Sequence, residues 1–558
     1  MQMTGAEVMI KCLQDEGVTT VFGYPGGAIL PFYDALRASN IKHILTAHEQ
    51  GAAHAADGYA RATGKVGVCI ATSGPGATNL VTGIANAFLD SIPLIAITGQ
   101  VQCDMIGHDA FQEVDITGIT MPIVKQNFLV KRKEDLAQIF RLAFQIATTG
   151  RPGPVLIDVP RDVQTAVVEY HSDKLRDVAV AMPDAELVKK AAEALNNAKH
   201  PVMLVGGGVI NADAEYEAMH VCEKLHLPVV STLMGLGCIS AYRALFLGMS
   251  GLHGHERANR ALSEADVILA VGTRFNDRVT GSRSKYSANK TIIHIDIDPA
   301  EIDKNIETEI GISGDMRTAL NMLEKNVVAH DMGSWWEQIM QWPSLDEDFG
   351  KAKAPLFIKA LNPLLKDKDF IVTTDVGQHQ MFTAQHLKVQ YARQLLTSGG
   401  LGTMGFGLPC AMGAKLARPG AKVISISGDG GFKMTSSELF TISRYNIPIT
   451  VVVFNNVGLG MIRQLQTVSF AKRYFACQLN RAEDVVDFVK LGESFGIEGV
   501  HVETPEEFAA AVEKSMNLER PFVIEVDIDP ADMVIPMVAP GQGIADFVEG
   551  LDDITFDM

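Results

Sequence analysis

The chain has 558 residues, of which 47% are apolar and 20% are charged, and its formal net charge is −18. This composition is typical of a folded protein of several domains and excludes a disordered or membrane-embedded chain. The negative charge also argues against a nucleic-acid partner, because no basic stripe would offset phosphate repulsion.

The chain begins with Thr4-Gly-Ala-Glu7, a capping-box pattern that predicts a helix to about Asp15. No signal-peptide or transit-segment pattern is visible in this sequence, and no apolar run reaches the ~20 residues that span a membrane. The seven cysteines are scattered and never form a C-x-x-C pair, which is typical of reduced thiols and excludes a zinc site. We therefore expect a cytoplasmic protein with neither a membrane nor a nucleic acid as partner.

Alternating strand and helix patterns divide the chain into three blocks, which predicts an α/β protein of three consecutive parallel-sheet domains. The blocks cover residues 1–166, 184–335 and 355–530, and a tail follows over 531–558. The charged stretch 167–177 is typical of a linker. The predicted strands are 19–22, 43–46, 66–71, 94–98 and 155–159, then 201–205, 228–231, 267–271 and 291–295, then 370–373, 423–427, 450–454 and 522–526.

In the first block, Glu49 follows a predicted strand and precedes small apolar residues, Ala52 to Ala62, that open a helix. A carboxylate at a helix N-terminus stabilises the helix dipole, and this local role alone would account for it. The tight, weakly polar surroundings also suit an acid that shares a proton with a ring nitrogen of a bound cofactor. The third block decides between the two interpretations.

In the second block, Gly206-Gly-Gly208 follows strand 201–205 and is a weak indication of a nucleotide-binding loop. Further on, Arg274 and Arg278 bracket Asn276-Asp277. A guanidinium group binds a carboxylate through two parallel hydrogen bonds, so Arg278 is a candidate for holding an acidic substrate. A salt bridge between domains is the alternative role.

The most informative pattern lies in the third block. An apolar run, 422–427, leads into Gly428-Asp429-Gly430-Gly431, and a second run, 448–454, leads into Asn455-Asn456. Because parallel strands end at the same edge of a sheet, the carboxylate and the amide should lie close together. These oxygen ligands suit a hydrated Mg²⁺ that binds a diphosphate, and the glycines admit phosphates to the backbone N–H groups. The sequence therefore predicts a magnesium–diphosphate site.

A nicotinamide site is the competing interpretation of this block. Gly400-Leu-Gly402-Thr-Met-Gly405 matches the dinucleotide motif, and Asp429 ends the next strand, where a ribose-binding acid is expected. Only the short run 394–397 precedes these glycines, however, and Asn455-Asn456 would then have no role.

The paired motifs of the third block, together with His48-Glu49, resemble those of thiamine diphosphate (ThDP) enzymes. The segments 109–113 and 272–281 are typical of a narrower family. They resemble the catalytic large subunits of acetohydroxyacid synthase, also called acetolactate synthase. Similar segments spread over the whole chain, at 22–27, 48–61, 72–79, 375–379 and 399–407. The resemblance implies three domains of the ThDP-dependent decarboxylase type: pyrimidine-binding (PYR, 1–166), FAD-binding (184–335) and diphosphate-binding (PP, 355–530).

The resemblance also implies three ligands, namely ThDP, Mg²⁺ and FAD, and a role for individual residues. Glu49 would activate ThDP from one subunit while the partner holds the metal, so a homodimer or a dimer of dimers would form its active sites at the subunit interface. The implied metal ligands are Asp429, Asn456 and the Gly458 carbonyl. The implied ThDP-binding residues are Val376, Gly377, Gln378, His379, Gly402, Met404, Gly430, Gly431 and Met461. The implied FAD-binding residues are Gly206, Gly207, Gly208, Thr232, Leu233, His253, Gly272, Arg274, Asp296 and Asp315.

The implied reaction is the decarboxylation of pyruvate and the joining of the remaining two-carbon unit to a second 2-oxoacid. Pyruvate as acceptor gives 2-acetolactate and 2-oxobutyrate gives 2-aceto-2-hydroxybutyrate, the first common step of branched-chain amino acid biosynthesis. The implied catalytic residues are Glu49, Gln112, Lys125, Arg278 and Met404, the last as the wedge that bends the cofactor. The implied substrate pocket comprises Phe111, Gln112, Lys125 and Leu465. Whether a small regulatory subunit binds is left open.

Three positions depart from the family pattern. Leu465 stands where most relatives carry Trp, which predicts a weaker preference for 2-oxobutyrate and a low sensitivity to sulfonylurea herbicides. Gln102 replaces a Pro, which also predicts a low sensitivity to these inhibitors. Asn276 replaces an Asp of the FAD segment, so the resemblance is closer at the ThDP site than at the flavin site.

Three alternatives stay open at this point. The nearest is a flavin-independent, catabolic acetolactate synthase, which the retained FAD residues disfavour. Another ThDP-dependent 2-oxoacid decarboxylase or oxidase is disfavoured by Gln112, Lys125 and Arg278. A non-catalytic, cofactor-binding homologue would be expected to lose Glu49 or a metal ligand, and the chain retains them all.

Overall fold

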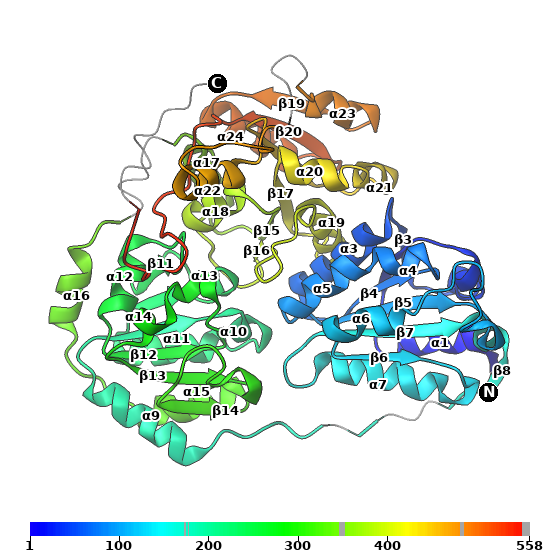
Figure 1. Ribbon diagram of the computed structural model, residues 1–558, viewed down its shortest axis with the longest axis horizontal. Coiled ribbons are helices and arrows are strands. Elements are labelled where there is room, and N and C mark those ends of the chain that lie inside the picture. Colours follow the sequence, from blue (N-terminus) through cyan, green and yellow to red (C-terminus); the bar gives the residue numbers. More distant parts are fainter. Residues whose placement is uncertain (172–174, 177, 345–351, 480–484, 549–558) are drawn as a thin grey trace.

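A computed structural model describes residues 1–171, 175–176, 178–344, 352–479 and 485–548 of the chain. Three lobes are each built on a six-stranded sheet, and every pair of neighbouring strands in these sheets is parallel. The N-terminal lobe (blue and cyan) and the C-terminal lobe (yellow and orange) meet directly, and the central lobe (green) lies beneath the latter (Figure 1). The predicted α/β class with three consecutive parallel-sheet domains is confirmed.

The N-terminal sheet has the strand order β3-β2-β4-β5-β7-β6. Every residue of β5 and β7 is buried, as expected for central parallel strands covered by helices on both faces. The strands are β2 (Thr20–Gly23), β3 (Lys42–Leu45), β4 (Gly67–Ala71), β5 (Leu94–Gln100), β6 (Gln126–Leu129) and β7 (Pro154–Pro160). The helices are α1 (Gly5–Asp15), α2 (Leu30–Arg37), α3 (Glu49–Thr63), α4 (Pro75–Asn79), α5 (Val81–Leu89), α6 (Ile116–Thr120), α7 (Leu136–Thr148) and α8 (Arg161–Thr165).

The start of this domain differs in part from the prediction. The capping box is confirmed, since Thr4 Oγ1 accepts from the Glu7 N–H and Glu7 Oε2 accepts from the Thr4 N–H. The segment expected to be a linker, however, begins with a strand, β8 (Val167–Glu169), which pairs antiparallel with β1 (Gln2–Thr4). Three residues are too few to show a periodic pattern. Residues 172–174 and Asp177 of the expected linker lie outside the described residues.

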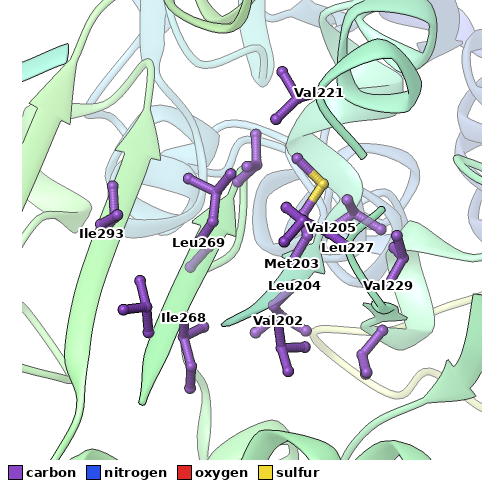
Figure 2. Close-up of a cluster of buried hydrophobic side chains, with 14 of the residues drawn as sticks. Val202, Met203, Leu204, Val205, Val221, Leu227, Val229, Ile268, Leu269 and Ile293 are labelled. Carbon is purple, nitrogen blue, oxygen red and sulfur yellow. The ribbon is translucent and has the colours of Figure 1, made fainter. Parts of the chain in front are cut away.

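The central sheet has the order β11-β10-β9-β12-β13-β14. Figure 2 shows its core, where side chains of β9, β12 and β13, among them Val202, Leu269 and Ile293, lie side by side. The strands are β9 (Pro201–Val205), β10 (Val229–Ser231), β11 (Phe246–Met249), β12 (Val267–Val271), β13 (Thr291–Asp296) and β14 (Ile310–Ser313). The helices are α9 (Ala185–Asn197), α10 (Gly207–Asn211), α11 (Glu215–Leu225), α12 (Glu256–Glu264), α13 (Asp277–Thr280), α14 (Arg283–Ser287), α15 (Met316–Asn326) and α16 (Gly333–Met340).

The C-terminal sheet has the order β16-β15-β17-β18-β20-β19. Its two central strands, β17 and β18, carry the predicted metal ligands just beyond their carboxyl ends. The strands are β15 (Phe370–Thr374), β16 (Leu395–Leu396), β17 (Lys422–Gly428), β18 (Thr450–Asn455), β19 (Gly499–Val502) and β20 (Phe522–Asp527). The helices are α17 (Ala354–Leu365), α18 (Gln378–His386), α19 (Gly407–Ala417), α20 (Asp429–Thr435), α21 (Glu438–Arg444), α22 (Gly460–Ser469), α23 (Phe488–Ser494) and α24 (Pro505–Met516).

The domains are joined by helix packing and by hydrogen bonds between them. Helices α3 and α19 pack so closely that a Cβ at Gly58 would collide with the Cys410 carbonyl, and one at Gly413 with that of Ala55. The tail beyond β20 crosses to the central domain (red in Figure 1), where the Val538 N–H donates to the Leu252 carbonyl at 2.8 Å. Residues 549–558 of the expected tail lie outside the described residues.

Candidate functional site

A cavity of about 1710 Å³ lies between the central and C-terminal domains, and the N-terminal domain contributes one wall through residues 88–91 and 148–152. Single small-molecule sites usually measure about 300–1,000 Å³, so this cavity has room for two ligands of cofactor size. The predicted site residues that line it are Gly207, Gly208, Thr232, Leu233, His253, Gly272, Arg274, Arg278, Asp296, Asp315, Val376, Gly377, Gln378, His379, Gly402, Met404, Asp429, Gly430, Gly431, Asn456, Gly458, Met461 and Leu465.

Asp429 provides a buried carboxylate at one end of the cavity. Strand β17 ends at Gly428 and α20 begins at Asp429, whose residue is only 1% exposed. Among the described residues no hydrogen-bond donor reaches its Oδ2, and the Lys433 ammonium lies 3.9 Å away. Burial raises the pKa of Asp429 to about 6. A buried carboxylate oxygen without a hydrogen-bond donor is suited to a cation, which would supply the missing partner.

Asn456 and Gly458 lie at the same end of the cavity, just beyond β18. Asn456 Oδ1 accepts from the Gly458 N–H at 3.2 Å, and its amide nitrogen lies 3.4 Å from Gln378 Oε1. A carboxylate, an amide oxygen and a backbone carbonyl are the hard oxygen ligands that Mg²⁺ accepts alongside water and phosphate. The residues present therefore fit a magnesium ion that also binds a diphosphate.

The first turn of α18 forms the adjacent wall. Gly377 precedes it with a φ of 154°, a conformation that favours glycine. Free backbone N–H groups at a helix start suit a diphosphate. Asp375 holds this turn, because its buried carboxylate accepts from the N–H groups of Val376, Gly405 and Gly407 at 2.8 to 3.1 Å. Burial raises the pKa of Asp375 to about 6.

The loop that carries Gly402 and Met404 is held from the N-terminal domain. Asp90, at the end of α5, accepts from the N–H groups of Gly399 and Gly400 at 3.1 and 2.7 Å and forms a buried ion pair with Arg61 at 2.8 Å. Nothing in the local sequence of Asp90 had indicated this role. The two glycines that it binds are more than 300 residues away, so no spacing pattern could have revealed it.

The other end of the cavity is lined by glycine turns of the central domain. A Cβ at Gly208 would lie 2.7 Å from the Cα of Gly272, so the two turns approach each other as bare backbone. Burial lowers the pKa of His253 to about 4 and raises that of Asp296 to about 6. Asp315 caps α15 by accepting from the Thr318 N–H at 2.9 Å. The predicted Gly206 is not among the described residues that line the cavity.

Arg278 and Leu465 line the same cavity. The Arg278 side chain is 67% exposed, and its nearest carboxylate, that of Asp277, lies 3.7 Å away. Leu465, on α22, packs against Met533 and Met537 of the tail. Asn276 Oδ1 accepts from the Val279 N–H at 3.1 Å and so caps α13.

The predicted residues of the N-terminal domain lie elsewhere. Glu49, Phe111, Gln112 and Lys125 are not among the described residues that line the cavity. Glu49 begins α3 and accepts from Asn79 Nδ2 at 2.9 Å, while Phe111 is 87% exposed. Gln112, with a φ of 59°, packs against Gly74 at the start of α4, the helix that ends with Asn79.

Lys125 has local partners of its own. Its ammonium donates to the carbonyls of Ile146 and Thr149 at the C-terminal end of α7, and burial lowers its pKa to about 8. Within one chain, then, the predicted metal, diphosphate and flavin residues come together, and Glu49, Gln112 and Lys125 do not join them.

Comparison with known families gives three adjoining matches. They are the thiamine pyrophosphate enzyme N-terminal TPP binding domain over residues 3–119, the central domain over 188–323 and the C-terminal TPP binding domain over 375–526.

Curated relatives match over nearly the full length. A probable acetolactate synthase large subunit of Methanocaldococcus jannaschii is 47% identical over 98% of this chain and 95% of the relative. The acetolactate synthase isozyme 2 large subunit of Escherichia coli is 45% identical over 98% of this chain and 100% of the relative. The acetolactate synthase large subunit of Haemophilus influenzae is 41% identical over 98% of each.

Proposed function

This chain belongs to the family of acetolactate synthase large subunits, three-domain thiamine pyrophosphate enzymes, and we propose that its cavity holds Mg²⁺ and FAD beside the thiamine cofactor. The chain is a ThDP-dependent acetolactate synthase. It decarboxylates pyruvate and joins the remaining two-carbon unit to a second 2-oxoacid. The observation that carries the cofactor assignment is the meeting of Asp429, Asn456 and Gly458 at one end of a cavity whose other end is built from glycine turns.

At the diphosphate end, Asp429, Asn456 and the Gly458 carbonyl would hold Mg²⁺. The N–H groups of Gly430, Gly431 and the first turn of α18 would bind the phosphate oxygens. Bound ThDP supplies an electron sink for the loss of CO₂ from a 2-oxoacid. Met404 and the Gly402 carbonyl, on the loop held by Asp90, would set the orientation of the pyrimidine ring.

The second 2-oxoacid would be bound by Arg278. Its guanidinium lines the cavity, and within the described parts of the chain its one ion-pair contact is that of Nε with Asp277, so its outer N–H groups remain for a carboxylate. Leu465 and the tail residue Met537 close the same region with apolar surface and would exclude water.

FAD would occupy the end of the cavity built from the central domain. The close approach of the turns at Gly208 and Gly272 leaves bare backbone for a dinucleotide, and Arg274 adds a half-buried cation. The predicted reaction has no net redox step, so the flavin would have a structural role. Asn276 caps α13, a task for which its amide oxygen suffices, and this favours retention of the flavin.

A second copy of the chain would complete the site by bringing its Glu49 to the pyrimidine ring, where the carboxyl would hold a proton at ring nitrogen N1′. Large apolar side chains are exposed on both domains that would meet: Phe111 (87%) and Met121 (69%) on the domain of Glu49, and Met434 (59%) and Phe475 (83%) on the domain of Asp429. Large exposed apolar groups of this kind mark association surfaces. We therefore propose a homodimer, or a dimer of dimers, as the active form.

One further partner and a location belong to the proposal. The relatives are named large subunits, so we propose that a small regulatory subunit binds this chain. All seven cysteines are free, which supports a cytoplasmic location. Over the part of the chain that the structure describes, none of the helices combines the length and the apolar character needed to cross a bilayer.

The proposal is tested by assaying the purified chain with pyruvate, ThDP and Mg²⁺, with and without FAD. Acetolactate that forms only with FAD supports the flavin-dependent enzyme. Acetolactate without FAD would favour the flavin-independent alternative, and acetaldehyde alone would contradict the assignment of Arg278. The dimer is tested by mixing Glu49→Gln chains with Asp429→Asn chains. Each mixed dimer would contain one intact site, so activity should reappear, whereas sites confined to one chain would stay inactive.

A further inference from the structure

We propose that Glu438, a buried carboxylate of the C-terminal domain, is a positioning residue that fixes Glu49 for its work on the cofactor. Glu438 lines no part of the cavity and belongs to no motif of the sequence. The inference rests on the proposed role of Glu49. It adds that this role depends on a residue of the C-terminal domain.

The contacts of Glu438 point to the turn in front of Glu49. Glu438 begins α21 and is 0% exposed. Its Oε1 accepts from the His48 N–H at 3.1 Å and its Oε2 accepts from the Ala47 N–H at 3.2 Å. Thr441 Oγ1 donates to Oε2 at 2.7 Å and so fixes the plane of the carboxylate. The two backbone groups bound by Glu438 therefore belong to the residues immediately before Glu49.

Neighbouring contacts from the same helix extend this hold. A Cβ at Gly51 would collide with the Glu438 carboxylate, so the first turn of α3 lies directly against it. The Leu45 N–H donates to the Tyr445 hydroxyl at 3.0 Å. The end of β3, the turn and the start of α3 are thus all fixed by one face of α21.

A simple helix-capping role does not account for Glu438. The N-terminus of α3 already has a local cap, because His48 Nδ1 accepts from the Gln50 N–H at 3.1 Å. Glu438 instead binds the two N–H groups that lie outside the helix, and these determine where the helix start is placed. The Glu49 carboxylate itself is held separately, by Asn79.

The chemistry of these contacts requires a carboxylate. Three neutral donors approach its two oxygens, and in the described part of the chain none of its hydrogen-bond partners is a cation. An amide would keep one acceptor oxygen and turn an NH₂ group toward a backbone N–H, so at least one donor would lose its partner. Replacement by Gln, which is nearly isosteric, should therefore displace the turn without creating a cavity.

The position of Glu438 also joins two active sites. Helix α20, which begins with the metal ligand Asp429, is followed directly by α21, which begins with Glu438. In the proposed dimer, Asp429 serves the site on its own chain, while Glu49 of that chain serves the other site. The segment from Asp429 to Glu438 therefore connects the metal of one site to the acid of the other.

The experiment compares Glu438→Gln, Glu49→Gln and the double variant in the full chain with ThDP and Mg²⁺. The rate at which solvent deuterium replaces the proton at C2 of bound ThDP reports on cofactor activation, and it is measured by acid quench and NMR. Because small misplacements of a reacting group cost up to about 100-fold, we expect Glu438→Gln to slow this exchange by about 10- to 100-fold. ThDP affinity should change less than about threefold, since the diphosphate contacts are intact. The double variant should be no slower than Glu49→Gln alone.

Control variants separate positioning from a general loss of structure. Asp158→Asn removes another buried acid that has only neutral donors, in the same domain as Glu49 and away from the cavity, and it should exchange at the wild-type rate. Thr441→Val keeps the Glu438 carboxylate but removes the hydrogen bond that fixes its orientation. This variant should therefore slow exchange less than Glu438→Gln does. If Glu438→Gln does not fold, Thr441→Val tests the positioning role in its place. Exchange at the wild-type rate in Thr441→Val would then overturn the inference.

The two ways of failing are distinct. Normal exchange in Glu438→Gln together with slow exchange in Glu49→Gln would overturn the inference and leave the proposed function intact. Normal exchange in Glu49→Gln would overturn the proposed role of Glu49 itself. Additive losses in the double variant would mean that Glu438 acts on the cofactor independently of Glu49, which would also overturn the inference.

Discussion

The carboxylate of Asp90 accepts the backbone N–H of Gly400 at 2.7 Å, across the boundary between the first and last domains. Its other oxygen forms the buried ion pair with Arg61 at 2.8 Å. One side chain thus both shares a buried cation with Asp57 and holds the loop that presents Gly402 and Met404 to the cavity. Stability and cofactor geometry therefore depend on the same residue.

Asp90→Asn should lower both stability and cofactor affinity. The amide keeps one acceptor oxygen, so either Arg61 loses one of its two carboxylate partners, Asp57 and Asp90, or the Gly400 N–H loses its acceptor. Breaking a buried pair in this way costs about 3 kcal/mol. Thermal unfolding with and without ThDP measures both effects. Glu223→Gln, which removes the exposed ion pair with Arg243, is the control and should cost less than about 1 kcal/mol. Equal effects of the two variants would contradict the prediction.

Arg278→Lys should impair use of the second 2-oxoacid. A lysine keeps the charge but cannot form two parallel hydrogen bonds to a carboxylate, so kcat/KM should fall about 10- to 100-fold. ThDP affinity should stay unchanged. Arg283→Lys, an exposed position on the neighbouring α14, is the matched control. Steady-state kinetics with pyruvate and 2-oxobutyrate provide the measurement, and an unchanged kcat/KM would remove Arg278 from the substrate site.

Leu465→Trp should raise the preference for 2-oxobutyrate over pyruvate. Leu465 lines the cavity and contacts the tail, so a larger side chain would add apolar surface there. One methylene in an apolar pocket discriminates by about tenfold or more, which sets the expected size of the change. Competition between the two oxoacids gives the ratio directly. Leu465→Met, which conserves volume, should leave it unaltered; a Trp variant with the same ratio would contradict the prediction.

Stability should fall as the pH rises towards neutrality because of Asp158 on β7. Its carboxyl accepts from the neutral donors Thr98 and Gln100 at 2.7 and 3.0 Å, and burial raises its pKa to about 7. The unfolded chain releases this proton near the ordinary pKa of 3.8, so the folded state binds more protons between these two values. The stability of the folded state therefore falls as the pH rises through this window. The loss is on the order of 4 kcal/mol.

Asp158→Asn tests this pH dependence. The amide can donate to Thr98 and accept from Gln100, as the protonated acid does, so the variant should lose much of the decline. Thermal midpoints of both proteins at about pH 5 and about pH 8 make the comparison. An identical decline in wild type and variant would assign the pH dependence to other groups.

The parts of the site that the sequence predicted are those at the ends of central strands. Asp429 and Asn456 follow long apolar runs, and parallel strands bring such positions together whatever the rest of the chain does. The three-sheet architecture was predictable for the same reason. The unpredicted strands β6, β11, β14 and β19 all lie at sheet edges, where shorter and less apolar segments suffice.

The parts that could not be predicted act over long distances in sequence. Asp90 and Glu438 have no informative neighbours in sequence, and the backbone N–H groups that they bind lie more than 300 residues away. Asp375 was noted only as part of a longer segment, although it binds three backbone N–H groups. Lys125 was expected in the substrate pocket, and in the single chain its ammonium binds the end of α7. Its role in an assembled site stays a prediction.

The close packing of α3 against α19 has a consequence for biosynthesis. Almost every residue of α3 from Gly51 to Ala62 is buried, and the partner helix comes roughly 350 positions later in the chain. As the protein emerges from the ribosome, the first domain can form its own sheet, but this face has no cover until residue 417 has been synthesised. Contacts of such high sequence separation form slowly and leave apolar surface exposed in the meantime. Chaperones should therefore bind the newly synthesised first domain while the second domain is being translated.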